Sequence, residues 1–419
     1  MFDELDTQSV KTRETALFAS FSDRLEQILP HCPGWAKHLE GYLSNAIVDR
    51  KSLQALPVLR KSVLMQSQQE HPPFGGFVNE SSLDGCRVFM SPGPVWEPQL
   101  SGSDPWQAAR SLAAAGIKRG QRVHNAFSYH LTPGGFILDE GARALGCIVF
   151  PAGAGGTDSQ VQSIQHLQSE VYVGTPDYLQ VLLDHAVEQG TPISSIKRAM
   201  VSGGALFPAM RVKYEEQGIH VQQSYATADF GVIAYETATN NVVHPGMVVN
   251  EGLIVEILVP GTDKPVNPGD VGEIVVTRLN KGYPLIRFGT GDLSAEILEP
   301  SPCGRTQMRL AGWMGRADQR VKVRGMFVDP VQLQVLPKEV YEVDGWRLVV
   351  YRDSDKDVME LLVTLKSDAV SPAAERATIE SRLVAALKGA TNLSGTVKIV
   401  DSLPNDGIIV EDKRDYEAN

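Results

Sequence analysis

The sequence predicts an α/β protein with a large N-terminal domain of mostly parallel sheets and a β-rich subdomain, followed by a small α+β C-terminal domain. Short apolar runs alternate with helical patterns between residues 104 and 223, which is typical of a covered parallel sheet. β-rich runs follow from residue 250, and a compact βαβ-like pattern follows Gly315. Because 419 residues exceed what one core normally supports, we expect two domains, 1–317 and 318–419.

The composition excludes several classes of protein. A net charge of −11 disfavours general nucleic-acid binding, although it leaves room for a local basic patch that takes a small anion. The four cysteines lie far apart without a CxxC pair, which argues against a zinc ribbon or a disulfide framework. The acidic N-terminus lacks the apolar core of a secretory signal, and no apolar run approaches the ~20 residues that span a bilayer. We therefore expect a cytoplasmic protein without a membrane partner.

Periodicity and proline positions predict the elements of the first domain. Apolar residues recur at helical spacing over 12–29 and Pro30 follows, so we predict an amphipathic helix with a stop. Thr175 before Pro176 predicts a helix start, because threonine caps and proline tolerates the first helical position. In the alternating region we predict helices over 104–115, 136–145 and 208–217, and strands over 122–127, 147–150, 171–173, 199–201 and 220–223.

The later elements are mainly strands. Runs over 253–259 and 273–277 flank a proline- and glycine-containing turn, which predicts two paired strands. After a boundary near Asp318, we predict strands over 347–351, 359–365 and 397–400 and a helix over 371–388.

Three segments carry the clearest motifs: Ser224-Tyr-Ala-Thr-Ala-Asp229, Pro284-Leu-Ile-Arg-Phe-Gly-Thr-Gly-Asp292 and Gly315-Arg-Ala-Asp-Gln-Arg-Val-Lys-Val-Arg-Gly-Met-Phe-Val-Asp-Pro330. Weaker motifs are Leu56-Pro57, Gly155-Gly-Thr-Asp-Ser-Gln160, Thr175-Pro-Asp-Tyr178 and Ser202-Gly-Gly-Ala205. In this order, and over nearly the whole chain, the segments resemble the adenylate-forming (AMP-binding) superfamily, and most its phenylacetate–CoA ligase branch.

The resemblance implies two half-reactions. A carboxylate attacks the α-phosphate of ATP and releases pyrophosphate, and the thiol of CoA then attacks the acyl-adenylate and releases AMP. It also implies a mobile C-terminal domain, a small carboxylic acid or acyl thioester as substrate, and CoA or acyl-CoA, AMP or ATP, and Mg²⁺ as ligands.

The same resemblance assigns nucleotide-site residues. Asp292 occupies the ribose-binding position, where a carboxylate accepts hydrogen bonds from both hydroxyls, and Arg287 and Arg316 lie in register with it. By itself, Asp292 would equally suit an Asx turn. Tyr225 would flank the adenine, or it would be a core aromatic residue at a strand end.

Three further residues complete this set. Gly204 and Ala205 match another strand end of the nucleotide site, although small residues there would also suit a helix start. Asp229 stands where the family usually has a glutamate that holds Mg²⁺, and aspartate is a competent but shorter ligand.

Other positions correspond to the hinge, the thiol arm and the acyl group. Asp318 matches the hinge, or it is a linker without regulated motion. Arg324-Gly325 matches the segment that approaches the pantetheine of CoA, or it is a surface turn. The family's acyl pocket corresponds to Tyr129, Thr132, Gly134 and Gly135, which would suit a flat aryl group or a tight turn.

The phosphate loop departs from the family pattern Ser-Ser-Gly-Thr-Thr-Gly-Lys-Pro. The aligned segment is Ser91-Pro-Gly-Pro-Val-Trp-Glu-Pro98, which lacks both threonines. Two prolines remove backbone donors that would cradle phosphates, and Glu97 replaces the lysine. A negative charge there would cost about 1 kcal/mol beside a solvated phosphate at 4 Å, so we expect poor binding of pyrophosphate.

The tail departs as well. The family's catalytic lysine follows a glycine, but here Ile408 or Asp406 occupies that position, depending on the alignment. Lys413 would substitute only if its loop reached further. Because losing one such contact typically lowers rates by ~10²–10³, both departures weaken the adenylation step and leave the CoA side better preserved.

Three hypotheses follow. The chain is an aryl- or acyl-CoA ligase with impaired adenylation, or an ATP-independent transferase that moves an acyl group between CoA and an acyl carrier protein. The third is a pseudoenzyme that binds another protein. The sequence leaves open whether the chain forms a homodimer.

Overall fold

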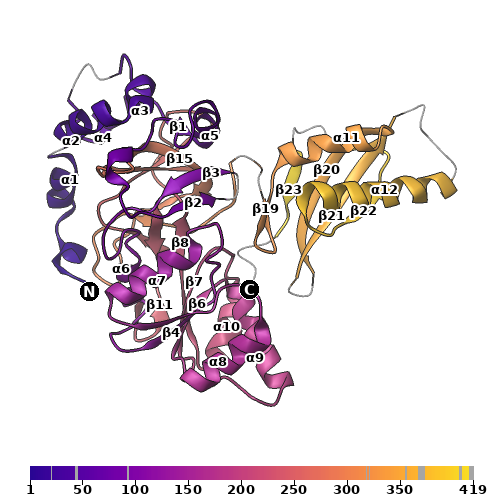
Figure 1. Cartoon of the computed structure of the whole chain (residues 1–419), viewed down its shortest axis with the longest axis horizontal. Coiled ribbons are helices and arrows are strands. Elements are labelled where there is room, and N and C mark those ends of the chain that lie inside the picture. The colour runs from indigo at the N-terminus through magenta and orange to yellow at the C-terminus, as the bar shows by residue number, and fades with distance from the viewer. Residues whose placement is uncertain are drawn as a thin grey trace. The chain divides into compact units, whose positions relative to one another are not determined.

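The computed structural model describes residues 1–19, 21–42, 46–91, 94–317, 319, 321–353, 356–366, 373–404 and 408–414. The chain divides into two compact units, Met1–Met314 and Gly315–Ala418 (Figure 1). The predicted division at 317/318 falls three residues further along, and the predicted hinge Asp318 lies outside the described residues. Within the described part of the chain, every helix is too short or too polar to cross a bilayer.

A nine-stranded sheet forms the centre of the first unit, in the order β16-β17-β12-β9-β8-β7-β6-β4-β5. The last five strands in this order pair in parallel, which confirms the predicted parallel sheet. They are β4 (Arg122–Asn125), β5 (Ile148–Pro151), β6 (Val171–Gly174), β7 (Arg198–Val201) and β8 (His220–Thr227). The other strands pair antiparallel: β9 (Gly231–Tyr235), β12 (Met247–Val249), β16 (Glu296–Ile297) and β17 (Arg309–Leu310).

Helices cover both faces of the parallel strands because neighbouring side chains point to opposite faces. Val171 and Val173 pack on the side of α6 (Ala108–Ala114) and α7 (Gly134–Ala144). Tyr172 packs in the other cluster, with α8 (Thr157–Leu167), α9 (Pro176–Glu188) and α10 (Pro208–Glu216), which lie together in Figure 1. Pro176 begins α9 as predicted, but the N-cap residue Thr175 makes no side-chain capping bond.

A second sheet of four strands, in the order β1-β15-β14-β13, packs against the N-terminal helices. Its strands are β1 (Leu59–Arg60), β13 (Ile254–Leu258), β14 (Gly272–Arg278) and β15 (Leu285–Ser294). The predicted helix over 12–29 forms two helices, α1 (Val10–Phe18) and α2 (Phe21–Ile28), on either side of residue 20. The chain between them and β4 forms η2 (Leu29–His31), α3 (Pro33–His38), α4 (Arg50–Leu53), α5 (Lys61–Glu70), η3 (Glu80–Ser82), and the hairpin strands β2 (Val88–Ser91) and β3 (Val95–Pro98).

The second unit contains a four-stranded sheet in the order β22-β21-β20-β23. β21 (Lys356–Leu365), α12 (Ala373–Thr391) and β22 (Thr396–Ile399) form a parallel βαβ unit. The sequence did not predict that β20 (Val343–Asp353) pairs antiparallel with β21, or that β23 (Val410–Asp412) pairs in parallel with β20. The remaining elements are β18 (Val321–Val323), β19 (Met326–Val328), η4 (Pro330–Val335) and α11 (Leu336–Glu339).

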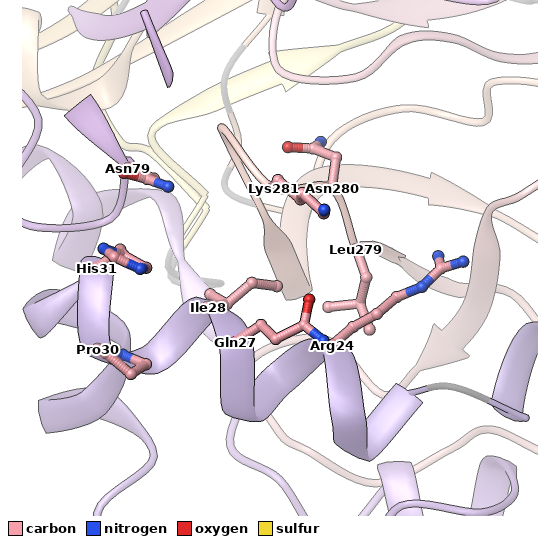
Figure 2. A pocket seen from close by; sticks show the side chains of 9 residues that line it. All are labelled: Arg24, Gln27, Ile28, Pro30, His31, Asn79, Leu279, Asn280 and Lys281. Atoms are coloured by element: carbon pink, nitrogen blue, oxygen red, sulfur yellow. The ribbon is translucent and has the colours of Figure 1, made fainter. Parts of the chain in front are cut away.

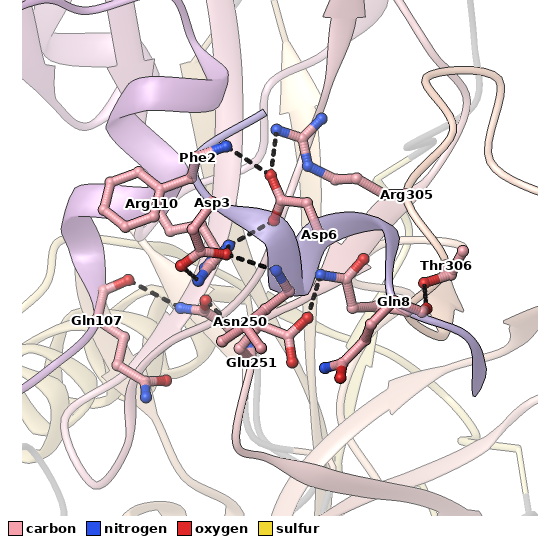
Figure 3. Close-up of polar contacts among 12 residues, drawn as sticks. Phe2, Asp3, Asp6, Gln8, Gln107, Arg110, Asn250, Glu251, Arg305 and Thr306 are labelled. Carbon is pink, nitrogen blue, oxygen red and sulfur yellow. Dashed lines mark hydrogen bonds and ion pairs between the residues drawn. The ribbon is translucent and has the colours of Figure 1, made fainter. Parts of the chain in front are cut away.

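Buried ion pairs hold the acidic N-terminal segment against the rest of the first unit (Figure 3). Asp6 lies in η1 (Glu4–Thr7) and is completely buried between the guanidinium groups of Arg110, at 2.5 Å, and Arg305, at 3.3 Å. Asp3 holds the other side of the Arg110 guanidinium at 2.6 Å. Because a buried charge is tolerated only with a partner, these residues depend on one another.

We predict that Asp6→Asn destabilises the first unit by about 3 kcal/mol, because it leaves two buried guanidinium groups without their shared carboxylate. Urea unfolding followed by circular dichroism measures the loss. Glu4→Gln, an exposed change in the same short helix, is the matched control and should leave the midpoint unchanged. Equal midpoints for Asp6→Asn and the control would contradict the role of this network.

Candidate active site

The parallel strands bring most of the predicted site residues to one edge of the sheet. The chain leaves β4 toward β5 on one side and leaves β6 toward β7 on the other, so the strand order reverses between them. Ligands of open α/β sheets bind in the crevice at the carboxyl ends of the strands beside such a reversal. Tyr129 follows β4, Gly204 and Ala205 follow β7, and Tyr225 lies near the end of β8.

Two residues of the predicted nucleotide site, Tyr225 and Asp292, contact one another in the structure. The Tyr225 hydroxyl donates to Asp292 Oδ2 at 2.7 Å, and Trp313 Nε1 donates to Asp292 Oδ1 at 3.0 Å. These two bonds fix the orientation of the carboxylate, the kind of group that accepts charge-assisted hydrogen bonds from hydroxyl groups. Trp313 was not predicted, because nothing in the sequence connects it to a residue 21 positions earlier.

The loop after β7 lies beside this pair. Ser202 Oγ donates to the Ser224 carbonyl at 2.7 Å, which holds the ends of β7 and β8 together. A Cβ atom on Gly204 would lie 3.3 Å from the Pro176 ring, so the loop passes close to the start of α9. Gly204 and Ala205 therefore line the same edge as Tyr225, although their contact with a nucleotide stays a prediction.

Arg287 does not face a ligand, and the prediction that it contacts the nucleotide is wrong. Its side chain is 0% exposed and forms an ion pair with Glu256 at 3.0 Å. It also donates to the carbonyl groups of Leu56 and Gln54, which join β15 to the N-terminal segment. All of its polar capacity is used inside the protein, so Arg287 is a structural residue.

The predicted acyl-pocket residues pack against one another. A Cβ atom on Gly135 would lie 2.8 Å from the Tyr129 ring, so the glycine permits this close approach. The Tyr129 hydroxyl donates to Asp139 at 2.8 Å and accepts from Asn125 at 2.7 Å, which fixes the ring. Gly134 begins α7, and Thr132 lies half-buried just before it. The aryl-pocket assignment stays a prediction.

The segment aligned with the phosphate loop forms the β2–β3 hairpin. Ser91 pairs with Val95 across the hairpin, and Pro92 and Gly93 lie outside the described residues. The retained hydroxyl of Ser91 is buried and donates to the Val95 carbonyl at 3.4 Å. Among the described residues, the hairpin therefore turns its only hydroxyl inward.

Glu97 on β3 is buried, with 2% of its surface exposed. Neither carboxyl oxygen has a hydrogen-bond donor among the described residues, so Glu97 can bond to the neighbouring Asp229 only by carrying a proton itself. Burial, and next the charge of Asp229, raise the pKa of Glu97 well above its ordinary value. The raised pKa favours the neutral acid, and the expectation that Glu97 presents a negative charge to the phosphates stays a prediction.

Lys61 places a positive charge beside the buried carboxylate of Asp229. Lys61 Nζ lies 3.3 Å from Asp229 Oδ2, and this ammonium group is the largest of the influences that lower the pKa of Asp229 against the opposing effect of burial. Gln68 of the same helix, α5, exchanges two hydrogen bonds of 2.9 Å with the backbone of Trp96. The helix that carries Lys61 is thereby fixed to the strand that carries Glu97.

Two more residues close this corner of the site. The Arg278 guanidinium donates to the carbonyl groups of Phe230, at 2.8 Å, and Asp229, at 3.4 Å. Burial lowers the pKa of Arg278 to about 10, which leaves it charged at neutral pH. Burial raises the pKa of Tyr283, with further contributions from Glu97 and Asp229. Sequence reasoning missed these residues and Lys61, although Lys61 follows the Leu56-Pro57 motif by four positions.

The residues present do not fit a resident Mg²⁺. The side chain of Asp229 is 2% exposed and already lies beside the Lys61 ammonium group, so it is not accessible to a metal cation. Among the described residues, no three His, Cys, Asp or Glu side chains gather as a metal centre requires.

Residues of the second unit are described by themselves. Arg324 and Gly325 form the two-residue turn between β18 and β19, and both have positive φ, 47° and 83°, which is typical of a type I′ hairpin. Their sequence alternative, a surface turn, is confirmed, and a role toward CoA stays a prediction. Arg316 lies half-buried near the start of the unit.

Within residues 408–414, the described part of the tail, both cationic side chains lie beside carboxylates. Arg414 pairs with Asp412 at 2.6 Å and Asp357 at 2.9 Å, and Lys413 lies 3.5 Å from Glu411. Ile408 is 38% exposed, and Asp406 lies outside the described residues.

Comparison with known proteins identifies relatives. A family model for AMP-binding enzymes matches residues 141–282. The chain is 30% identical over 370 residues to a phenylacetate–coenzyme A ligase of Thermus thermophilus, covering 81% of this chain and 80% of that one. It is 28% identical to the Escherichia coli phenylacetate–coenzyme A ligase, over 95% of this chain and 93% of that one. A crystal structure of 2-hydroxyisobutyryl-CoA ligase matches with a TM-score of 0.81 and 24% identity, covering 98% and 92% of the chains, which shows the fold.

We predict that Glu97→Gln flattens the pH dependence of stability. Because the folded-state pKa of Glu97 is raised, its contribution is intact below the unfolded value of about 4.5 and is lost as the pH rises toward the folded value. The wild type should lose up to about 1.4 kcal/mol per pH unit relative to Glu97→Gln in that range. Thermal unfolding between about pH 5 and 8 measures the difference.

The matched control is Glu215→Gln, an exposed change on α10 that should leave the profile unchanged. If the wild type and Glu97→Gln lose stability in parallel as the pH rises, Glu97 is ionised in the folded protein.

Proposed function

Since the chain belongs to the AMP-binding, adenylate-forming family that contains the phenylacetate–coenzyme A ligases, we propose that it is an AMP-forming CoA ligase in which adenylation is the weak half-reaction. The proposed substrate is a small carboxylic acid, aryl or otherwise, with CoA as the thiol. The observation that carries the proposal is the contrast between the two ends of the nucleotide site.

The ribose end keeps what binding requires. Asp292 and Tyr225 are held together by a 2.7 Å hydrogen bond, and a carboxylate is a strong acceptor for the two hydroxyl groups of a ribose. Hydrogen bonds to a carboxylate contribute about 1.5–3 kcal/mol each, which is enough to retain AMP or an acyl-adenylate.

Among the residues that the structure describes, the groups at the phosphate end already have partners within the protein. The hairpin uses its hydroxyl internally, Lys61 is engaged by Asp229, and Arg278 donates to two carbonyl groups. Attack of the carboxylate on the α-phosphate, with departure of pyrophosphate, requires donors aimed at the charge that develops on the phosphates. The second half-reaction needs none of these, because the thiol attacks the acyl carbon, the acyl–phosphate bond breaks, and AMP leaves while the thiol loses its proton.

The same contrast favours a second candidate, an ATP-independent transferase that moves an acyl group between CoA and the pantetheine thiol of a carrier protein. One thioester bond forms as the other breaks, and the proton passes from the attacking thiol to the departing one. Both candidates use the CoA side and differ in whether ATP is a substrate.

Supplying the intermediate separates the half-reactions. We predict that the protein converts phenylacetyl-adenylate and CoA to phenylacetyl-CoA and AMP, whereas ATP with phenylacetate releases pyrophosphate at least ~10²-fold more slowly. Mass spectrometry of the thioester and a coupled pyrophosphate assay provide the two rates, and a panel of small aryl and alkyl acids extends both. Comparable rates would overturn the proposed impairment, and acyl transfer from an acyl-CoA to carrier protein without ATP would establish the second candidate.

We predict that Asp292→Asn weakens AMP binding about tenfold, because a neutral amide accepts the ribose hydrogen bonds less strongly than a carboxylate. Isothermal titration calorimetry with AMP measures the change. Asp84→Asn, at an exposed position, should bind AMP as the wild type does. An unchanged affinity in Asp292→Asn would show that this carboxylate does not contact the ribose.

A further inference from the structure

A cavity of about 540 Å³ lies in the first unit between α2 with η2 and the loop that follows β14 (Figure 2). None of its lining residues belongs to the predicted nucleotide, acyl or CoA positions. Figure 2 shows Arg24, Gln27 and Ile28 on one helix, with Asn280 and Lys281 on the facing loop and His31 and Asn79 at the far end. The polar lining consists of Arg24, His31, Lys281, Gln27, Asn79 and Asn280, without a carboxylate.

The walls of this cavity are fixed before any ligand arrives. The backbone N–H of Asn79 donates to the Gly282 carbonyl at 2.9 Å, which ties the two ends of one wall together. The backbone N–H of Tyr283 donates to Asn280 Oδ1 at 2.6 Å. On the other wall, Leu25 and Ile28 anchor α2 in the core. A preformed site loses less conformational entropy on binding.

The basic side chains of this cavity are open to solvent and to a ligand. Arg24, His31 and Lys281 are exposed and make no side-chain hydrogen bond or ion pair to any residue that the structure describes. The amide nitrogen of Asn280 is buried and has no acceptor within the described residues. In a chain of net charge −11, this is a local concentration of positive charge and unused donors.

We propose that this cavity binds the phosphate group of a small, hydroxyl-bearing molecule. The cationic side chains suit a phosphate dianion, and the amides of Gln27, Asn79 and Asn280 both donate to and accept from hydroxyl groups. The cavity falls within the volume range of small-molecule sites. The site is independent of the proposed function.

Glucose 6-phosphate is the test probe, titrated into the full-length protein by isothermal titration calorimetry. We expect binding in the range of about 1 mM or tighter, and no binding of glucose. Inorganic phosphate should compete, which distinguishes recognition of the phosphate from recognition of the sugar. Succinate, a dianion with carboxylate groups, should compete at least about tenfold more weakly.

The double change Arg24→Gln with Lys281→Gln should weaken glucose 6-phosphate binding at least about tenfold, whereas Lys118→Gln, at an exposed position elsewhere, should not. Asp292→Asn should also leave it unchanged, which separates this site from the nucleotide site. Circular dichroism establishes that each variant is folded. No binding by the wild type, equal competition by succinate, or full binding by the folded double variant would overturn the proposal.

Discussion

The candidate site is organised around the cost of burying two acids beside one ammonium group. Glu97 and Asp229 both lie out of water, and a low-dielectric corner does not accommodate two negative charges next to a single lysine. Burial and the charge of Asp229 raise the pKa of Glu97, whereas Lys61 lowers the pKa of Asp229, so this corner favours a proton on Glu97 and a negative charge on Asp229. This arrangement requires the hairpin and α5 to lie together, and the Gln68–Trp96 hydrogen bonds hold them there.

This arrangement has a consequence for the bound nucleotide. Charged groups that satisfy one another cannot also neutralise a triphosphate without breaking their own contacts. At the ribose end, by contrast, Asp292 accepts hydrogen bonds from two neutral donors, Tyr225 and Trp313, and a carboxylate in that setting is a strong acceptor for hydroxyl groups. The two ends therefore differ in whether their charged groups already have partners. Near the phosphate end, Lys61 pairs with Asp229, and Arg278 donates to two backbone carbonyl groups.

Much of the fold was predictable because it depends on local patterns. The apolar runs that became β4 to β8 have helices between them, and this alternation requires a parallel sheet. Asp292 and Tyr225 were identified through motifs. The order of those motifs along the chain is what assigned both residues to one nucleotide site. Glu97 was identified, but the sequence did not show that its pKa depends on Asp229, which lies 132 positions away. The sequence did not predict the β2–β3 hairpin, because Pro92, Gly93 and Pro94 indicate only a loop.

The same reasoning explains why arginine positions are poor guides to function by themselves. Arg287 lies in a conspicuous motif, yet Glu256 and two backbone carbonyl groups use it entirely. Arg24 and Lys281 lie in no motif, yet they are left without a partner among the described residues. Both side chains are exposed, so water solvates them in the free protein. Their position on two fixed walls, with no carboxylate in the lining, leaves them available to an anionic ligand, which is the basis of the proposed phosphate site.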